Sequence, residues 1–564
     1  MTFFEKLRIY LQVIRWRLTW NRRKLDYLPP GINNKKFITA REAAGRVADG
    51  SVALSCGMAG NARCSVFFWA IRDAFFKNGH PKNLTWINVG AQGGRGKAPG
   101  TVEELALPGL VSRYITGHHE TAKTLLQLAE KQQVELVTMP QGEMSLLLEA
   151  QGRGEDSILS PVGVGTFLDP RTGRGPVVTG GDAKPYVEPE GDLLRYRLPK
   201  IQTVFFNAPY ADAEGNIYFK DAATITENLQ GAQAARANGG QVIATVAGIV
   251  PKDESKVGMP AVDVDAIVVH PLNEQTASIP QLKPWPEFTI GTKVNIPEAR
   301  EKLRLINHLM KITPVRGEVE CALARLGAYV FSKTVKPGAL ANIGVGYAEE
   351  VCRVIFEQGL DKDITFTTET GVYGGLPSPG IFFGSAIAPE KMITSAEMFQ
   401  LYRTKLDVAV LGFLQVDSQG NVNGSNRGPR YTDYVGPGGF PDIAMGAKTI
   451  FFVGTWMAKA HFAIENGQFF IKKPGNVKFV EQVDEVTFNG QKGLETGKQI
   501  FYVTNVGVFQ LTHHGLELRW IVPGVNIEQD IVSASKAKIY VSKNLETVDA
   551  SVLTGRNFEL NWHL

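Results

Sequence analysis

Long apolar runs and paired cysteines are both missing from this sequence. No stretch of about 18 uncharged apolar residues occurs, the length that a membrane-spanning helix needs. Charged residues interrupt the N-terminal segment where a signal peptide would have its apolar core. The four cysteines are too sparse for a disulfide framework and show no C-x-x-C spacing. We therefore expect a cytoplasmic protein with buried, reduced thiols at Cys56, Cys64, Cys321 and Cys352.

An excess of one charge sign is also missing. The chain has 60 Lys and Arg against 56 Asp and Glu, a net charge of +4, which predicts no nucleic-acid partner. The adjacent histidine pairs at 118–119 and 513–514 have no third ligand at a suitable spacing, so we expect no metal site. We also expect no permanently bound cofactor.

Several catalytic signatures are absent. The chain has no G-x-x-x-x-G-K-[ST] loop for ATP and no G-x-S-x-G elbow for a nucleophilic serine. The segment GVGYAE at 344–349 lacks the third glycine of the dinucleotide fingerprint, so a dinucleotide-dependent dehydrogenase is a poorly supported alternative.

The patterns that are present predict an α/β fold. Short apolar runs such as SVALSC and NLTWINV precede helical or glycine-rich segments, as in chains that form mainly parallel sheets. With 564 residues the chain is too long for one core. Five prolines among polar residues at 271–300 predict a linker. We expect one half over 36–270 and another over 301–564.

Residues 1–35 form a basic extension that we expect to be helical. Seven Lys and Arg residues lie among apolar residues before a Pro-Pro pair, and the apolar positions do not form one clean helical face. We favour a helix that docks on the protein's own surface or at a subunit contact. The alternative is weak contact of residues 3–24 with an anionic membrane surface.

The two halves resemble each other. KNLTWINVGAQGGRGKAPG at 82–100 parallels KDITFTTETGVYGGLPSPG at 362–380, and each is a β-rich run that opens into a loop with a glycine pair. Two D-x-x-G-N segments, ending at Asn216 and Asn421, follow. The first half is longer between these landmarks, which predicts an insertion at about 139–200. Such self-similarity indicates two homologous open halves with an active site between them.

The second copy alone carries an acid, Glu369, where the first has Asn88 or Val89. A lone glutamate in a glycine-rich loop is usually a solvated surface residue. However, the C-terminal end of a parallel strand is where open α/β sheets bind ligands, and the glycines that follow let backbone amides approach a substrate. Glu369 is therefore a candidate catalytic group.

At these residues the sequence resembles the family I coenzyme A-transferases, in particular the single-chain acetate, propionate and acetoacetate type. The resemblance runs from about residue 36 to 564 through six motifs: GAQGGRGKAPG, MPQGEMS (139–145), GVGTFLDPRTGRG (163–175), NIGVGYAEEV (342–351), ETGVYGGLPSPG and GPGGFPDIAMGAKTIFFVGTW (436–456). Two loops depart from the family pattern: residues 55–69 lack the usual proline, and Ala348 stands where the second half usually has proline.

The resemblance implies that Glu369 becomes esterified to CoA, with Gln92 and the Gly438–Gly439 backbone near the reacting carbonyl. It further implies a ping-pong exchange between an acyl-CoA and a short-chain carboxylic acid, with CoA as substrate and covalent intermediate, in a homo-oligomer. Residues expected to bind CoA or substrate are Gly93, Gly94, Gly344, Gly346, Gly374, Gly375 and Asn421. The alternatives are an acyl-CoA hydrolase that uses the same glutamate and a non-catalytic CoA-binding scaffold.

Overall fold

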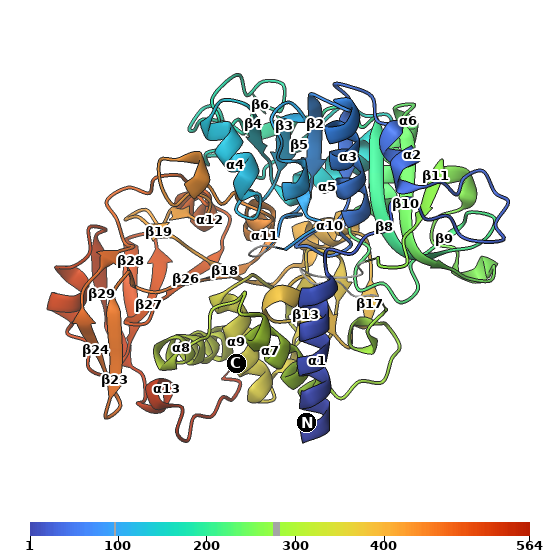
Figure 1. The fold of residues 1–564 in the computed structure, drawn as a ribbon. Coiled ribbons are helices and arrows are strands. Elements are labelled where there is room, and N and C mark those ends of the chain that lie inside the picture. The colour runs from blue at the N-terminus through green and yellow to red at the C-terminus, as the bar shows by residue number, and fades with distance from the viewer. Residues whose placement is uncertain (95–97, 274–282, 564) are drawn as a thin grey trace.

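Two large sheets, each covered by helices, follow one another along the chain and form the upper and lower parts of the molecule in Figure 1. The computed structural model describes residues 1–94, 98–273 and 283–563. This architecture confirms the predicted α/β fold of two mainly parallel halves. Of the predicted proline-rich linker at 271–300, residues 274–282 lie outside the described residues.

The first half is built on a parallel sheet. Its strands follow the order β11-β10-β8-β1-β2-β3-β4, and a short antiparallel strand, β9, pairs with β8. The bounds are β1 Val52–Ser55, β2 Leu84–Asn88, β3 Val111–Thr116, β4 Glu135–Thr138, β8 Thr203–Ala211, β9 Ile217–Tyr218, β10 Gln241–Ile249 and β11 Ala266–Val269. The helices are α2 Ala40–Gly45, α3 Ser65–Asn78, α4 Lys123–Glu130, α5 Gln141–Gly152 and α6 Asn228–Ala237.

The second half has a parallel centre with antiparallel additions on both sides. Its order is β17-β14-β13-β12-β18-β21-β26-β27-β28-β29. The bounds are β12 Leu340–Ile343, β13 Thr365–Thr368, β14 Val372–Tyr373, β17 Lys391–Met392, β18 Val408–Gly412, β21 Thr449–Val453, β26 Gln499–Val503, β27 Gly507–Thr512, β28 Gly515–Ile521 and β29 Ile539–Thr547. The helices are α7 Ile296–Met310, α8 Glu318–Thr334, α9 Tyr347–Glu357, α10 Ser395–Lys405, α11 Phe440–Gly446, α12 Gly490–Glu495 and α13 Ser551–Thr554.

The repeat seen in the sequence has a structural counterpart. The order β11-β10-β8-β1-β2 in the first sheet corresponds to β26-β21-β18-β12-β13 in the second, with parallel pairing throughout. Helices α5 and α10 occupy matching places in the two chain orders and pack against each other. The halves therefore meet through equivalent helices.

The first half contains elements that have no match in this correspondence. Strands β3 and β4 extend its sheet, and a three-stranded antiparallel sheet follows, with β5 Ile158–Ser160, β6 Val187–Glu190 and β7 Leu193–Tyr196. The extra elements thus extend from Val111 to Tyr196. The predicted insertion at 139–200 covers only the later ones, and it includes α5, which corresponds to α10.

Smaller two-stranded sheets lie around the second half. They pair β15 Leu376–Pro377 with β16 Ala386–Ile387, β19 Gln415–Val416 with β20 Val422–Asn423, β22 Met457–Ala458 with β25 Asn476–Val477, and β23 His461–Glu465 with β24 Gln468–Lys473. Strands β23 and β24 lie beside β27–β29 in the lobe at the left of Figure 1.

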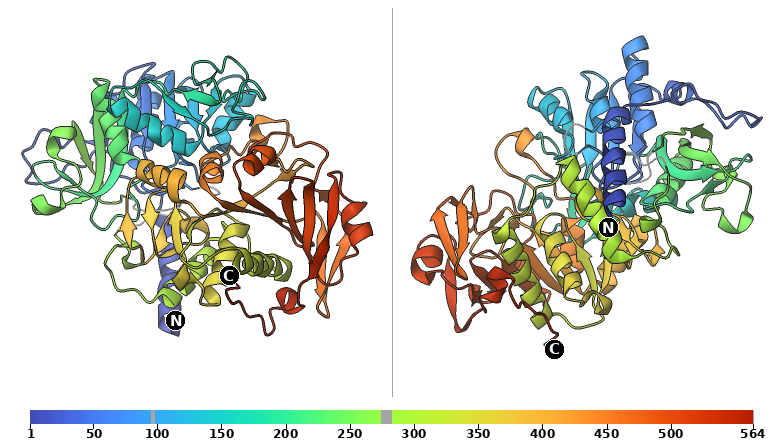
Figure 2. Two further views of the ribbon diagram at one scale, coloured as in Figure 1. Left: turned by 180° about the vertical axis from the view of Figure 1, so that it is seen from behind. Right: turned by 60° about the horizontal axis from the view of Figure 1, so that its bottom comes forward.

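The N-terminal helix α1 (Phe3–Thr19) packs on the second half although it precedes the first half in sequence. Figures 1 and 2 show it beside α7. Ile9, Val13 and Trp16 are buried, and Trp16 stacks on Trp285 with ring centroids 5.9 Å apart. None of the helices in the described ranges is both long and apolar enough to cross a membrane.

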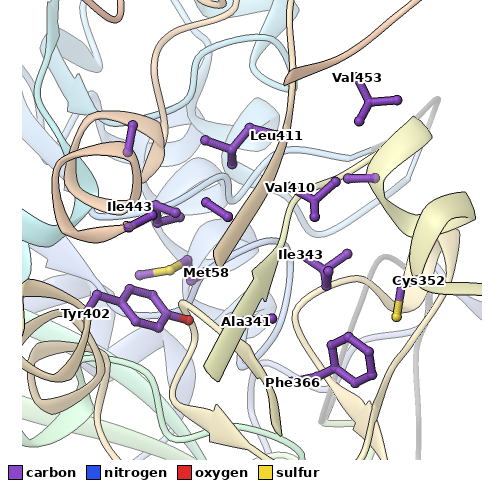
Figure 3. Close-up of a cluster of buried hydrophobic side chains, with 14 of the residues drawn as sticks. Met58, Ala341, Ile343, Cys352, Phe366, Tyr402, Val410, Leu411, Ile443 and Val453 are labelled. Carbon is purple, nitrogen blue, oxygen red and sulfur yellow. The ribbon is translucent and has the colours of Figure 1, made fainter. Parts of the chain in front are cut away.

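The apolar core is continuous between the halves. Figure 3 shows Met58, from the loop after β1, near Tyr402 and Ile443 of the second half, with Ala341 and Ile343 on β12 close by. All five side chains are buried and belong to one cluster. Because buried apolar surface is the main source of cohesion, the two sheets are held as one body, and the loops at their facing ends are fixed relative to each other.

Candidate active site

A cavity of about 850 Å³ lies between the two halves. It is lined by loops that follow the C-terminal ends of parallel strands, where open α/β sheets bind their ligands, and its volume suits a sizeable organic ligand. Its lining includes Met58–Gly60 after β1, Gly93 and Gly94 after β2, His118 after β3, Gly344–Gly346 after β12, Glu369 after β13 and Pro437–Phe440 before and at the start of α11.

Glu369 lies in a tight hairpin loop at one wall of this cavity. Strands β13 and β14 pair Thr368 with Val372, so Glu369 is the first of three connecting residues. The amide of Gly371 donates to the carbonyl of Thr368 at 3.0 Å and closes the turn. Gly371 has φ +104°, and a Cβ there would lie 1.9 Å from the carbonyl oxygen of Ile393, so only glycine fits.

Among the described residues, the side chain that hydrogen-bonds the glutamate carboxylate is that of Asn342. This asparagine lies on β12, in register with Thr367 of β13. Its Nδ2 donates to Glu369 Oε2 over a long 3.5 Å and to the Tyr402 hydroxyl at 2.9 Å. The Tyr402 hydroxyl in turn donates to Thr367 Oγ1 at 3.0 Å. An amide fixed by a second buried partner holds the carboxylate in one place.

Burial raises the pKa of Glu369 above its ordinary value, while a backbone hydrogen bond and the Asn342 amide act against that rise. The residue is only 9% exposed. A solvated glutamate would keep its ordinary pKa. The structure instead gives a more basic one, and a more basic carboxylate is a stronger nucleophile once it is ionised.

Six of the predicted glycines line the cavity: Gly93, Gly94, Gly344, Gly346, Gly438 and Gly439. They differ in what their amides do. The Gly438 amide donates to the Gly117 carbonyl at 2.7 Å and is already engaged. The Gly439 amide donates to no other residue in the described part of the chain, and Gly439 caps the N-terminus of α11. Of this predicted pair, Gly439 is the donor open to a ligand.

Gln92 lies behind the cavity wall rather than in it. Its side chain is fully buried, and its Nε2 donates to the Cys56 carbonyl at 3.4 Å. A Cβ at Gly57 would lie 2.3 Å from that nitrogen. Its neighbours Ala91 and Gly93 line the cavity, but Gln92 does not. Gln92 Oε1 is buried without a partner among the described residues.

Three other predicted binding residues lie outside the cavity lining and shape turns instead. Gly374 and Gly375, with φ near +73° and +74°, join β14 to β15. Asn421 donates from Nδ2 to Asp417 Oδ2 at 3.0 Å and accepts from the Gly490 amide at 3.1 Å. The geometry gives these residues a structural role, because the D-x-x-G-N pattern encodes a turn in both halves.

No sequence pattern predicts a role for Asn342, Tyr402 or the cations of the cavity. Asn342 had one signal, since it is a polar residue within an otherwise apolar buried strand. Three cations, Lys123, Arg304 and Arg316, line the cavity. Arg316 lies over the Tyr347 ring at 4.6 Å. Such cations can hold phosphate groups.

The described residues contain no cluster of His, Cys, Asp or Glu that could hold a metal ion. His119 is fully buried, which lowers its pKa to about 3. All four cysteines are free thiols, and Cys56, Cys64 and Cys352 are buried, whereas Cys321 is half-buried and lines the cavity.

Comparison with known proteins places this geometry in a family. Residues 37–270 match the family model described as coenzyme A transferase. The caffeate CoA-transferase of Acetobacterium woodii is 33% identical over 535 residues, covering 92% of this chain and 97% of that protein. The chain belongs to the coenzyme A-transferase family. It is a CoA-transferase, and its resemblance to the family, first seen in six motifs, is confirmed.

Other members support the same assignment. The acetate CoA-transferase YdiF of Escherichia coli K12 is 31% identical over 536 residues, covering 92% of this chain and 96% of YdiF. The structure of the YdiF apoenzyme from Escherichia coli O157:H7 superposes with a TM-score of 0.79 at 28% identity, covering 93% of this chain and 98% of that one. A YdiF thioester complex with CoA gives 0.80 at 27% identity, with the same coverage.

Proposed function

We propose that this CoA-transferase moves CoA from an acyl-CoA to a short-chain carboxylic acid by a ping-pong mechanism, with Glu369 as the covalent carrier. The observation that carries the proposal is a buried carboxylate at the wall of an 850 Å³ cavity, held by the Asn342 amide, at the C-terminal end of a parallel strand. Glu369 is the group at this place that can hold an acyl unit and then hold CoA.

The proposed chemistry needs no redox step and no external base. In the first step a Glu369 oxygen attacks the acyl-CoA carbonyl, the acyl–sulfur bond breaks, and a mixed anhydride and CoA thiolate form. The thiolate then attacks the glutamyl carbonyl of the anhydride, which releases the first carboxylate and leaves CoA as a thioester on Glu369. The same steps in reverse, with a second carboxylate, form the new acyl-CoA and free Glu369.

Two features of the cavity support these steps. Negative charge develops on the carbonyl oxygen during each attack, and the unengaged Gly439 amide at the N-terminus of α11 is suited to stabilise it. The cations Lys123, Arg304 and Arg316 at the cavity wall are suited to the phosphates of CoA. Gln92, which is buried behind the wall, would act on the reacting carbonyl only if the loop after β2 moved.

The relatives suggest the class of acid. Two curated members are named for caffeate and for acetate, and both names denote carboxylic acids that exchange CoA. We propose a small carboxylate acceptor for this chain as well, in a protein that forms a homo-oligomer. A panel of acyl-CoA donors against short and aromatic carboxylates, read by mass spectrometry of the CoA products, identifies the pair.

The test of the mechanism is the adduct on Glu369. Incubation with an acyl-CoA and no acceptor should leave CoA attached to the peptide that contains Glu369, and borohydride should then inactivate the enzyme by reducing the thioester. Glu369→Ala should abolish transfer, and Glu369→Asp, which withdraws the carboxylate by about 1 Å, should lower turnover about 10²-fold.

Glu350→Gln is the matched control, because Glu350 lines the same cavity but forms an ion pair with Arg353 at 2.6 Å. It should keep the adduct and most of the turnover. A CoA adduct on another residue, or a folded Glu369→Ala protein that still exchanges CoA between two acids, would contradict the mechanism. Steady release of CoA without an acceptor would assign the hydrolase alternative instead.

A further inference from the structure

Helix α1 has two apolar faces on opposite sides, and for this reason its apolar residues do not form one clean face in the sequence. Ile9, Val13 and Trp16 are buried against the protein beside α7. At 3.6 residues per turn, the opposite side of the helix carries a second set of apolar residues. These are exposed: Phe3 by 74%, Phe4 by 75%, Leu7 by 43%, Leu11 by 58%, Ile14 by 53% and Leu18 by 79%.

Cations flank the exposed face on both sides. On the helical circle Lys6 and Arg17 border one edge, where Lys6 pairs with Glu301 at 3.5 Å and Arg17 donates to the Met310 carbonyl at 2.7 Å, and Arg8 and Arg15 border the other. The helix contains one acid, Glu5, which caps its N-terminus together with Thr2. Residues 1–24 hold seven Lys and Arg against one Glu, a net charge of +6, whereas the whole chain carries only +4. Four of these seven cations lie on α1 and border this face.

The apolar spacing allows two partners for this face, a second copy of the helix or a lipid surface, and the charges decide between them. Phe4, Leu7, Leu11, Ile14 and Leu18 are separated by three and four residues in turn, the spacing of a two-stranded coiled coil. The positions beside that seam, however, hold Arg8, Arg15 and Arg17. An antiparallel second copy would place Arg8 against Arg15, which opposes pairing, and a parallel one would set these arginines beside Phe3 and Tyr10 with no acidic partner. A surface of negative charge would match them.

We propose that α1 docks this enzyme on an anionic phospholipid surface. Its exposed phenylalanines, leucines and isoleucine would enter the boundary between headgroups and acyl chains, while Arg8 and Arg15 would contact lipid phosphates. An apolar face bordered by basic residues on a helix too short and too charged to span the bilayer is the pattern of an interfacial helix. The buried face keeps the helix attached to the enzyme.

Docking and transfer chemistry use different residues. No residue of α1 belongs to the described lining of the cavity. Helix α7, on which α1 packs, contributes Arg304, Asn307 and His308 to that lining. Variants on the outer face of α1 should therefore leave transfer activity in solution unchanged, and this activity reports that the variant is folded.

The experiment is co-sedimentation of the full chain with vesicles. One set contains phosphatidylcholine alone, and the other contains phosphatidylcholine with phosphatidylglycerol. We expect binding to the anionic vesicles that weakens at high salt, and little binding to the neutral ones. Leu11→Glu with Ile14→Glu should abolish binding. Arg8→Gln with Arg15→Gln should weaken it by about 5-fold for each arginine.

Matched controls test whether changes to exposed apolar or basic side chains elsewhere on the protein have the same effect. Phe76→Glu alters a side chain that is 67% exposed on α3, and Lys77→Gln with Lys405→Gln removes two exposed charges elsewhere; neither should affect binding. The proposal is overturned if anionic vesicles do not bind the protein, or if the controls weaken binding as much as the α1 variants. It is also overturned if the exposed face of α1 is a contact between subunits. In that case the parent protein does not bind vesicles, and Leu11→Glu with Ile14→Glu lowers the mass of the assembly measured by sedimentation velocity.

Discussion

Glu369 lies between two opposing influences, burial that raises its pKa and the Asn342 amide that lowers it. The balance suits a group that must be ionised to attack and yet basic enough to attack well. Asn342 itself is held by the Tyr402 hydroxyl at 2.9 Å, and its Oδ1 is buried without a partner among the described residues. A buried amide that is only partly paired favours one orientation of the carboxylate at the expense of folding stability.

Asn342→Ala tests this balance through a pH profile. The asparagine donates to the charged carboxylate, so its removal should raise the pKa of Glu369 further. The carboxylate must be ionised to react, so activity is lost as the pH falls through that pKa. The acidic limb of kcat/KM should therefore move to higher pH, and turnover should fall on the order of 10-fold. An unshifted acidic limb would show that Asn342 does not act on the carboxylate.

Glu227→Gln concerns stability instead of turnover. Burial raises the pKa of this carboxyl to about 7 from 4.5, although the Gly57 amide donates to it at 2.8 Å. Between these two pH values the folded protein keeps a proton that the unfolded chain releases. The resulting contribution to the free energy of unfolding is fully present below pH 4.5 and is lost as the pH rises to 7. The shift corresponds to roughly 3 kcal/mol.

Urea unfolding between pH 5 and pH 8 measures that contribution. The free energy of unfolding of the parent protein should decrease over this range. In Glu227→Gln, whose side chain cannot ionise, the decrease should be much smaller. Glu559→Gln is the control, since Glu559 is exposed and far along the chain. Equal slopes for the parent and Glu227→Gln would contradict the assignment.

At the scale of elements, the β13–β14 hairpin positions the nucleophile. Its three-residue loop depends on Gly371, whose φ of +104° and close approach to the Ile393 carbonyl admit no side chain. Gly371→Ala should lower the melting temperature and, by displacing Glu369 by about 1 Å, lower kcat about 10²-fold. Gly45→Ala is the control, because nothing lies within 4 Å of the added carbon. Thermal unfolding and steady-state kinetics of both variants check this prediction.

The elements of the site differ in how well the sequence predicts them. The strand before Glu369 was predicted because its threonines and phenylalanine are β-formers that end at a glycine-rich loop. Asn421 and the pair Gly374–Gly375 were predicted to bind substrate, but turn-forming residues look alike whether or not a ligand lies beside them. Asn342 was missed as a functional residue, since only the pairing of β12 with β13 brings it near Glu369.

At the scale of the whole molecule, the two halves meet through groups that a repeat alone does not reveal. Arg403 of α10 forms an ion pair with the buried Glu143 of α5, and the Gly142 amide donates to Asp442 at 2.9 Å. The repeat predicted two similar sheets, and this is confirmed by their matching strand orders. It could not predict which helices face each other, because that depends on side chains distant in sequence.

Removal of α1 tests how the extension supports the second half. A chain that begins at Lys35 loses the buried Ile9, Val13 and Trp16 and uncovers Trp285. Burial of each such side chain contributes about 1.5–3 kcal/mol, so we expect a lower melting temperature. We expect kcat to be kept and the KM for acyl-CoA to rise, because α7 carries cavity residues. A soluble, folded chain without any turnover would contradict this prediction.

The place of α1 in the fold also affects how the chain is made. Its packing partner α7 begins at Ile296, whereas α1 ends at Thr19, so 276 residues must be added after α1 before its partner starts to form. At about 5–20 residues per second, this takes roughly 15 to 55 seconds on the ribosome. Throughout that interval the nascent helix exposes both apolar faces beside a concentrated positive charge. Until then Ile9, Val13 and Trp16 have no α7 to pack on, so the burial of α1 is among the late steps in forming the enzyme.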